Sequence, residues 1–172
     1  MSTKISIVTV TRNSAATIED TILSVSGQSY QYFEHIIIDG ASTDGTLDII
    51  NKHIGKFSKL VSEPDAGIYD AMNKGIGLAT SDVIGVINFD GFYASPTVLE
   101  AVATVFQDSV VLPCWGDLCF VTQHESSKIV RYWRSPSFVP GSFARGCCLP
   151  HPTFLSNVRC WRVLALPTWT SR

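Results

Sequence analysis

The fold of this chain is decided by the stretch Ile36-Ile37-Ile38-Asp39-Gly40-Ala41-Ser42-Thr43-Asp44-Gly45-Thr46. Three consecutive isoleucines make both faces of a strand apolar, because successive side chains point to opposite faces. This pattern is typical of a strand in a parallel sheet that is covered on both sides. The run stops at a carboxylate, and glycines then mark a turn into a helix. We therefore expect a buried strand that delivers Asp39 to the carboxyl edge of a sheet, where ligands bind in open α/β folds. A second interpretation is that Asp39 only caps local amides, as aspartates in turns do.

The quoted stretch consists of an apolar run, a polar turn and a helical pattern. The same succession occurs three more times in the chain. We predict strands at 5–10, 33–39, 60–62 and 83–87. We predict helices at 15–26, 47–54, 68–79 and 96–106, the last with Ser95 as N-cap and Pro96 as first residue. Strand–helix units with short connections favour an α/β fold with a mostly parallel, Rossmann-like sheet and flanking helices.

The character of the chain changes after residue 108. Apolar runs at 110–122 and 129–133 flank a polar turn, which predicts a C-terminal antiparallel hairpin. Residues 156–172 show neither helical nor strand periodicity. We therefore assign residues 1–155 to one domain and expect an irregular tail at 156–172, which we interpret as a truncated or frame-shifted end rather than a helix.

Composition restricts the classes of partner. The chain has 172 residues, of which 45% are hydrophobic and 16% charged, with a net charge of -2 and no cluster of lysine and arginine. This charge balance excludes a nucleic-acid partner, because such binding requires the neutralisation of phosphates. The five cysteines lack the spacing of a zinc site, and no stretch approaches the ~18 apolar residues of a membrane span. We expect a cytoplasmic protein, with peripheral contact at the inner face of a membrane left open.

Polar side chains at the ends of the first two predicted strands form one part of the candidate site. The first strand ends with Thr9, Thr11 and Asn13, and the second ends with Asp39. Parallel strands bring these ends to the same edge of the sheet. Carboxylate, amide and hydroxyl groups at that edge suit the base or ribose of a nucleotide.

Charged residues further along the chain form the other part. Lys74 is a candidate for binding phosphates, although a solvated helix lysine has the same pattern. Asp90 follows the fourth predicted strand, and a hard oxygen donor there suits Mg²⁺ or Mn²⁺. Asn88, water or a bound diphosphate would have to complete the ligand set, because one carboxylate makes a weak metal site.

Four segments carry a resemblance to a known family. They are Ile5-Ser6-Ile7-Val8-Thr9-Val10, the segment Asp39 to Thr46, the segment Ser62 to Gly75, and His151-Pro152-Thr153-Phe154. Together they resemble the family-2 glycosyltransferases, in particular bacterial enzymes of exopolysaccharide assembly of the colanic acid type. The resemblance covers about residues 4–155, and the segment from Glu63 to Gly75 is its most specific part.

The resemblance implies a GT-A fold and inverting transfer of a sugar from a nucleotide-diphosphate donor to a saccharide or lipid-linked saccharide in surface polysaccharide assembly. By position it implies that Asp39 contacts the base, that the Thr9 to Asn13 segment and Asp65 line the nucleotide pocket, and that Asp90 belongs to the metal-binding motif. Two departures give an alternative. Asp90 stands alone where the family has two acidic residues, and 156–172 contains no acidic residue or histidine to act as general base. The alternative is an inactive remnant that binds a nucleotide-sugar.

Two other enzyme classes lack support. A dinucleotide dehydrogenase would need Gly-x-Gly-x-x-Gly after the first strand, whereas Gly75 and Gly77 lie inside a predicted helix. Those two glycines indicate either close backbone approach or tolerated surface positions. The Cys147-Cys148 pair near His151 does not establish a cysteine hydrolase, because nucleophile and base must meet in space. His151 itself has either a structural role or a place near the ligand edge.

Overall fold

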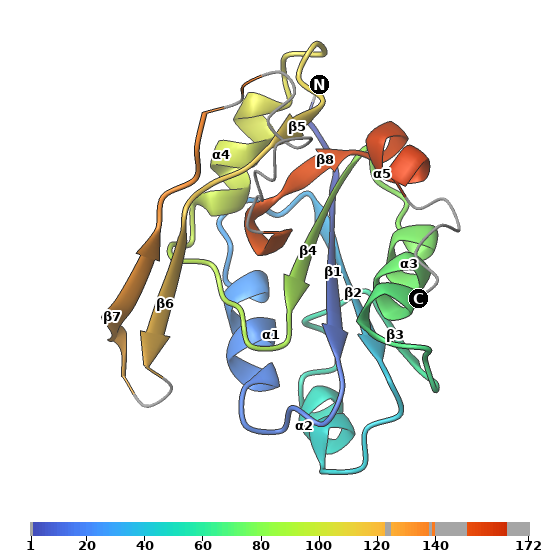
Figure 1. The fold of residues 1–172 in the computed structure, drawn as a ribbon. Helices are drawn as coiled ribbons and strands as arrows, with labels where there is room; N and C mark the ends of the chain where they lie inside the picture. Colours follow the sequence, from blue (N-terminus) through green and yellow to red (C-terminus); the bar gives the residue numbers. More distant parts are fainter. Residues whose placement is uncertain (1, 123–124, 138, 140–150, 165–172) are drawn as a thin grey trace.

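The computed structural model describes residues 2–122, 125–137, 139 and 151–164 (Figure 1). A six-stranded sheet has the order β3-β2-β1-β4-β8-β5. Its parallel strands are β1 (Ile5–Thr11), β2 (Phe33–Asp39), β3 (Lys59–Ser62) and β4 (Val83–Asn88). The short strands β8 (Leu155–Asn157) and β5 (Pro113–Cys114) add antiparallel pairs beside β4. The expected mostly parallel sheet is confirmed.

Helices cover both faces of this sheet. They are α1 (Ile18–Ser26), α2 (Thr46–Lys52), α3 (Ile68–Leu78), α4 (Val98–Val105) and α5 (Val158–Leu164). Helices α1, α2 and α4 lie on one face of the sheet, and α3 and α5 lie on the other (Figure 1). Side chains of each group form hydrophobic clusters with the strands on that face. Ile36 and Ile38 face α3, and Ile37 faces α1 and α2, so the three-isoleucine run is covered on both sides as predicted.

The predicted hairpin is also confirmed. It consists of β6 (Leu118–Thr122) and β7 (Glu125–Trp133), which form a separate two-stranded sheet (Figure 1). Strand β7 starts at Glu125 rather than at Ile129. Within the described ranges, no helix is long and apolar enough to cross a membrane.

Two helices begin later than predicted, because the residues before them are used in turns. The Ser14 amide donates to Thr46 Oγ1 at 2.8 Å and the Ala15 amide to Asp44 Oδ2 at 3.1 Å, so α1 starts only at Ile18. Helix α4 starts at Val98 with Thr97 as its N-cap, and not at Pro96. The predicted N-cap, Ser95, instead accepts a hydrogen bond from the Thr97 amide at 3.2 Å.

The prediction of an irregular tail is wrong for residues 156–164. They contain most of β8 and all of α5, so the predicted boundary at residue 155 cuts through a strand. Ser156 pairs with Ile84 of β4, and the Trp161 indole N–H donates to the Ile84 carbonyl at 2.9 Å. The regular structure of residues 156–164 depends on their pairing with β4, which is distant in the sequence, and the local periodicity of the segment does not indicate such pairing. Residues 165–172, like Cys147 and Cys148, lie outside the described residues.

The sheet contains a buried histidine whose protonation opposes folding. His35 of β2 is 1% exposed, its Nε2 lies 2.9 Å from Thr9 Oγ1, and burial lowers its pKa to about 3. The unfolded chain takes up this proton near pH 6.5, so the stability that neutral His35 contributes is fully present above that pH and is lost as pH falls towards 3. We expect the free energy of unfolding to fall by about 2 kcal/mol between pH 7 and pH 5 from this group.

Urea unfolding at both pH values measures this loss. The His35→Gln variant keeps every other titrating group, so the difference between the two proteins isolates His35. The variant should lose about 2 kcal/mol less than the unchanged protein on acidification. Equal losses in the two proteins would show that His35 takes up its proton in the folded state.

Candidate functional site

The candidate site lies at the carboxyl edge of the parallel strands. Strand β1 pairs with β2 on one side and with β4 on the other, and the registers place Thr11 opposite Asp39 and Val10 opposite Asn88. The chain therefore winds in one direction from β1 to β3 and in the other direction to β4. Open α/β sheets bind ligands at such a reversal, in the crevice outside the strand ends.

Asp39 is buried at this edge and its carboxylate is fully engaged by the protein. One oxygen accepts hydrogen bonds from the Ser42 amide at 3.1 Å and the Ser62 hydroxyl at 2.7 Å, and the other accepts from the Ser42 hydroxyl. The structure thus has the local capping that the second interpretation expects. Asp39 holds the turn after β2 against the end of β3, and its contact with a base stays a prediction. Neither serine was predicted as a site residue, although both lie within the quoted motifs.

The loop after β1 is held against the turn after β2. Asn13 adopts a φ of 50°, and its side-chain Oδ1 accepts a hydrogen bond from the Thr43 backbone amide at 2.9 Å. The backbone amide of Asn13 donates to Ser42 Oγ at 2.8 Å. Thr11 is buried, and its hydroxyl bonds to that of Ser14. Thr11 and Asn13 are therefore brought to the edge as predicted, where they shape the loops with the same polar atoms that were expected to bind a ligand.

Gly40 lies at the centre of the edge and allows two charged side chains to approach. A Cβ at this position would overlap Asp65 Oδ2 and would lie 3.3 Å from Arg12 Cδ. Asp65 is half-buried and accepts a hydrogen bond from the Gly67 amide at 2.9 Å, and Arg12 is exposed. The side chains of Asp65 and Arg12 therefore both approach Gly40. Asp65 was predicted as a site residue, whereas Arg12 was not singled out, although it lies within the segment from Thr9 to Asn13.

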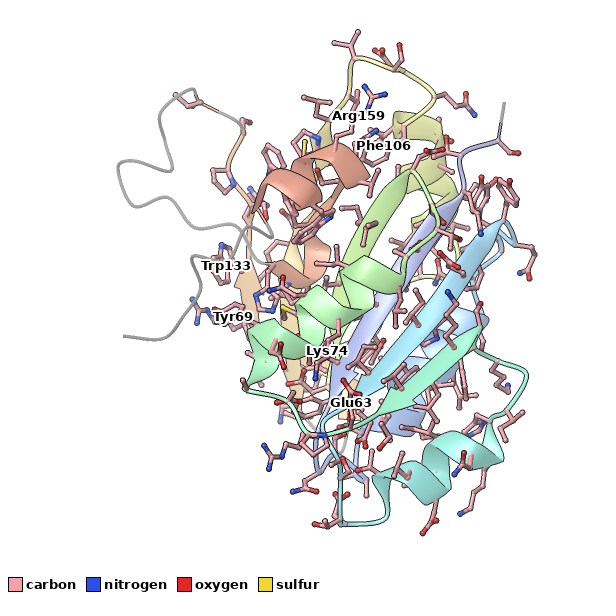
Figure 2. All side chains as sticks on the ribbon, turned by 90° about the vertical axis from the view of Figure 1, so that its right-hand side faces the viewer. Glu63, Tyr69, Lys74, Phe106, Trp133 and Arg159 are labelled. Atoms are coloured by element: carbon pink, nitrogen blue, oxygen red, sulfur yellow. The ribbon has the colours of Figure 1, made fainter. Side chains whose placement is uncertain are left out.

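Lys74 stabilises the loop between β3 and α3. Figure 2 labels Lys74 and Glu63, and the Lys74 ammonium lies 2.9 Å from the Glu63 carboxylate. The same ammonium lies 3.2 Å from the Asp70 carboxylate and donates to the Pro64 carbonyl at 3.1 Å. The hydrogen bond to Glu63 is the main reason that the pKa of Lys74 is raised. This lysine is not the solvated helix residue of the alternative interpretation, because it ties the loop that carries Asp65 to α3.

The structure does not bring Thr9 to the site. Thr9 lies two residues before the end of β1, about 7 Å along the strand from Thr11. It is fully buried between Ile37 of β2 and Ile87 of β4, and its hydroxyl bonds to His35. The prediction of a nucleotide contact from the Thr9 side chain conflicts with this burial, because a central position in the sheet has no path to the edge.

Asp90 is exposed in the turn after β4, where it was expected. Next to it, Asn88 Nδ2 lies 3.1 Å from His151 Nε2, and Asn88 Oδ1 is buried with no partner among the described residues. Burial lowers the pKa of His151, and the nearby charge of Asp90 opposes that shift. The Asn88 oxygen is therefore not exposed to a ligand, and the described part of the chain contains no group of three metal-ligating residues.

Comparisons with known proteins agree with this architecture. The family description "Glycosyl transferase family 2" matches residues 6–146. An uncharacterized glycosyltransferase of Mycobacterium tuberculosis is 33% identical over 114 residues, which are 65% of this chain and 44% of the relative. A PGL/p-HBAD biosynthesis glycosyltransferase of Mycobacterium bovis is 32% identical over 128 residues, or 73% of this chain and 44% of the relative. The chain thus spans less than half the length of these relatives.

Solved structures share the fold. A mannosyltransferase from Pyrobaculum calidifontis, in complex with GDP-Man and Mn²⁺, has a TM-score of 0.62 at 21% identity over 74% of this chain and 38% of its own. TarS of S. aureus, in complex with UDP-GlcNAc, has a TM-score of 0.60 at 22% identity over 64% of this chain and 33% of its own. These likenesses confirm the expected GT-A fold. The match over residues 6–146 extends through the whole parallel sheet, and the chain belongs to glycosyl transferase family 2.

Proposed function

We propose that this chain binds the nucleotide of a nucleotide-diphosphate-sugar at the edge around Gly40. The observation that carries the proposal is the convergence of three loops there, because the segments after β1, β2 and β3 meet where a Cβ would leave no room for Asp65. Asp65 and Arg12 are the charged groups beside this close approach, so they are the side chains we assign to the nucleoside. Two structural neighbours bind nucleotide-sugars, which supports this class of ligand.

We further propose that Asp90 faces the donor diphosphate. The residues present fit a divalent metal, because Mg²⁺ keeps several waters and is usually held by one or two carboxylates together with substrate phosphates. Asp90 is one exposed carboxylate at the end of β4, and Mn²⁺ accompanies GDP-Man in one structural neighbour. When bound, such an ion neutralises charge on the departing diphosphate.

The reaction we propose for the whole protein is transfer of the sugar, with inversion, to a saccharide or lipid-linked saccharide in surface polysaccharide assembly. The family membership supports sugar transfer, and the relative named for PGL/p-HBAD biosynthesis supports a biosynthetic role. Incubation with labelled nucleotide-sugars and lipid-linked saccharides tests it, and NMR of the product shows whether the anomeric configuration is inverted. Nucleotide binding without any transfer would instead favour the nucleotide-binding remnant.

Calorimetry with UDP and GDP, each with Mn²⁺, tests the binding half. The Asp65→Asn variant should bind the preferred nucleotide about tenfold more weakly, since a hydrogen bond to a charged group contributes about 1.5 kcal/mol or more. The matched control is Asp82→Asn, because exposed Asp82 precedes Val83 at the opposite end of β4 and should leave the affinity unchanged. Absence of binding to every nucleoside diphosphate by the folded chain would refute the proposal.

A further inference from the structure

The pair formed by Asn88 and His151 determines where the histidine carries its proton. Asn88 ends β4, His151 begins the short helical turn His151–Thr153, and Asn88 Nδ2 lies 3.1 Å from His151 Nε2. An amide nitrogen donates and never accepts, so Nε2 must be the ring nitrogen with the free lone pair. A neutral ring in this contact therefore has its proton on Nδ1.

The opposite orientation of the Asn88 amide is less favourable. It would let Oδ1 accept from an Nε2 proton, but it would move the NH₂ group into the buried position that Oδ1 now occupies. No described residue bonds to Oδ1 in that position. Two buried N–H donors without acceptors cost more than one buried carbonyl oxygen, because each unmet donor loses its full hydration.

We propose that His151 donates its Nδ1–H to the diphosphate of the sugar donor, and that Asn88 is the positioning residue that keeps the proton on Nδ1. The inference rests on the proposed function, which places the diphosphate beside Asp90. His151 is exposed, and Asp90 is close enough for its charge to act on the imidazole. Nε2 is the ring nitrogen that contacts Asn88, and no described residue bonds to Nδ1 of this exposed side chain, so the Nδ1–H is accessible to a ligand.

The chemical role is stabilisation of a leaving group. When the bond between the anomeric carbon and the diphosphate oxygen breaks, its electron pair remains on that oxygen, while the acceptor hydroxyl oxygen forms the new bond and loses its proton to a base. The Nδ1–H stays on His151 throughout and only strengthens its hydrogen bond as the negative charge grows. His151 thus supplies a donor in a fixed orientation without proton transfer.

NMR of the unchanged, ¹⁵N-labelled protein tests the proton position directly. Long-range ¹H–¹⁵N correlations at pH 8 distinguish the two neutral tautomers of each histidine, and the His151→Asn variant assigns the signals. We expect His151 to be the Nδ1–H tautomer, and the Asn88→Leu variant should lose that preference. An Nε2–H tautomer in the unchanged protein would overturn the inference, whether or not nucleotides bind.

Calorimetry with a matched pair of variants tests the contact. His151→Gln places its amide near Nε2 and loses the Nδ1 donor, so UDP or GDP should bind about tenfold more weakly. His151→Asn places an amide N–H near Nδ1 and should retain most of the affinity. The corresponding nucleoside monophosphates should bind all three proteins equally. Equal diphosphate affinity in both variants and the unchanged protein would refute the inference alone, whereas no binding by the unchanged protein would refute the proposed function.

Discussion

The Gly75→Ala variant should lose about 2 kcal/mol or more of its free energy of unfolding, the largest stability change expected for removing one glycine here. A Cβ on Gly75 would overlap Val8 Cγ1 and would lie 3.2 Å from Ile38 Cγ1. Both neighbours are fully buried in central strands, so neither has space to move. Urea unfolding of the variant at pH 7 measures the loss.

Gly77 provides the control in the same helix. A Cβ there has no neighbour within 4 Å, and Gly77 is exposed. Gly77→Ala should therefore raise the free energy of unfolding by roughly 1 kcal/mol, because alanine is the better helix former. A stabilised Gly75→Ala variant would show that α3 can move away from the sheet, contrary to this close approach.

The second large effect is expected on ligand affinity. Gly40→Ala should weaken the binding of the preferred nucleoside diphosphate about a hundredfold, or ~2.8 kcal/mol. The new Cβ would overlap the Asp65 carboxylate and would crowd Arg12, so both side chains proposed to contact the nucleoside must move. Stability should change little, because the overlapping atom is the free end of a side chain at the edge and not part of the core. Calorimetry measures the affinity, and urea unfolding measures the stability.

The neighbouring residue gives a matched control for the Gly40 variant. Ala41 has a φ of 56°, which is strained for any residue with a Cβ. Ala41→Gly removes that strain without placing an atom near Asp65, so it should raise stability by up to about 1 kcal/mol and leave the affinity unchanged. If Gly40→Ala and Ala41→Gly bound the nucleotide equally well, the site would lie away from Gly40.

Predictions from the sequence were most successful where the local pattern of an element shows which of its faces are buried. The unbroken apolar run at Ile36 to Ile38 predicts a strand covered on both faces, and the structure packs helices on both sides of it. It was least successful at residues 156–164, where β8 and α5 lack a regular pattern. Their order depends on Ser156 pairing with Ile84 and on the Trp161 indole bonding to the Ile84 carbonyl, contacts between residues far apart in the chain.

The sequence by itself determined the alternation of strands and helices, the edge at which Asp39, Asp65 and Asp90 gather, and the family to which the motifs belong. Only the tertiary structure decided which polar atoms at that edge are left for a ligand. The Thr9 hydroxyl bonds to His35, and the Lys74 ammonium pairs with Glu63 in the loop before α3. By contrast, the side chains of Arg12 and Asp65 both lie beside Gly40. The physical reason is that periodicity reports which side of an element is buried, but the partner of a polar atom depends on which distant segment packs beside it.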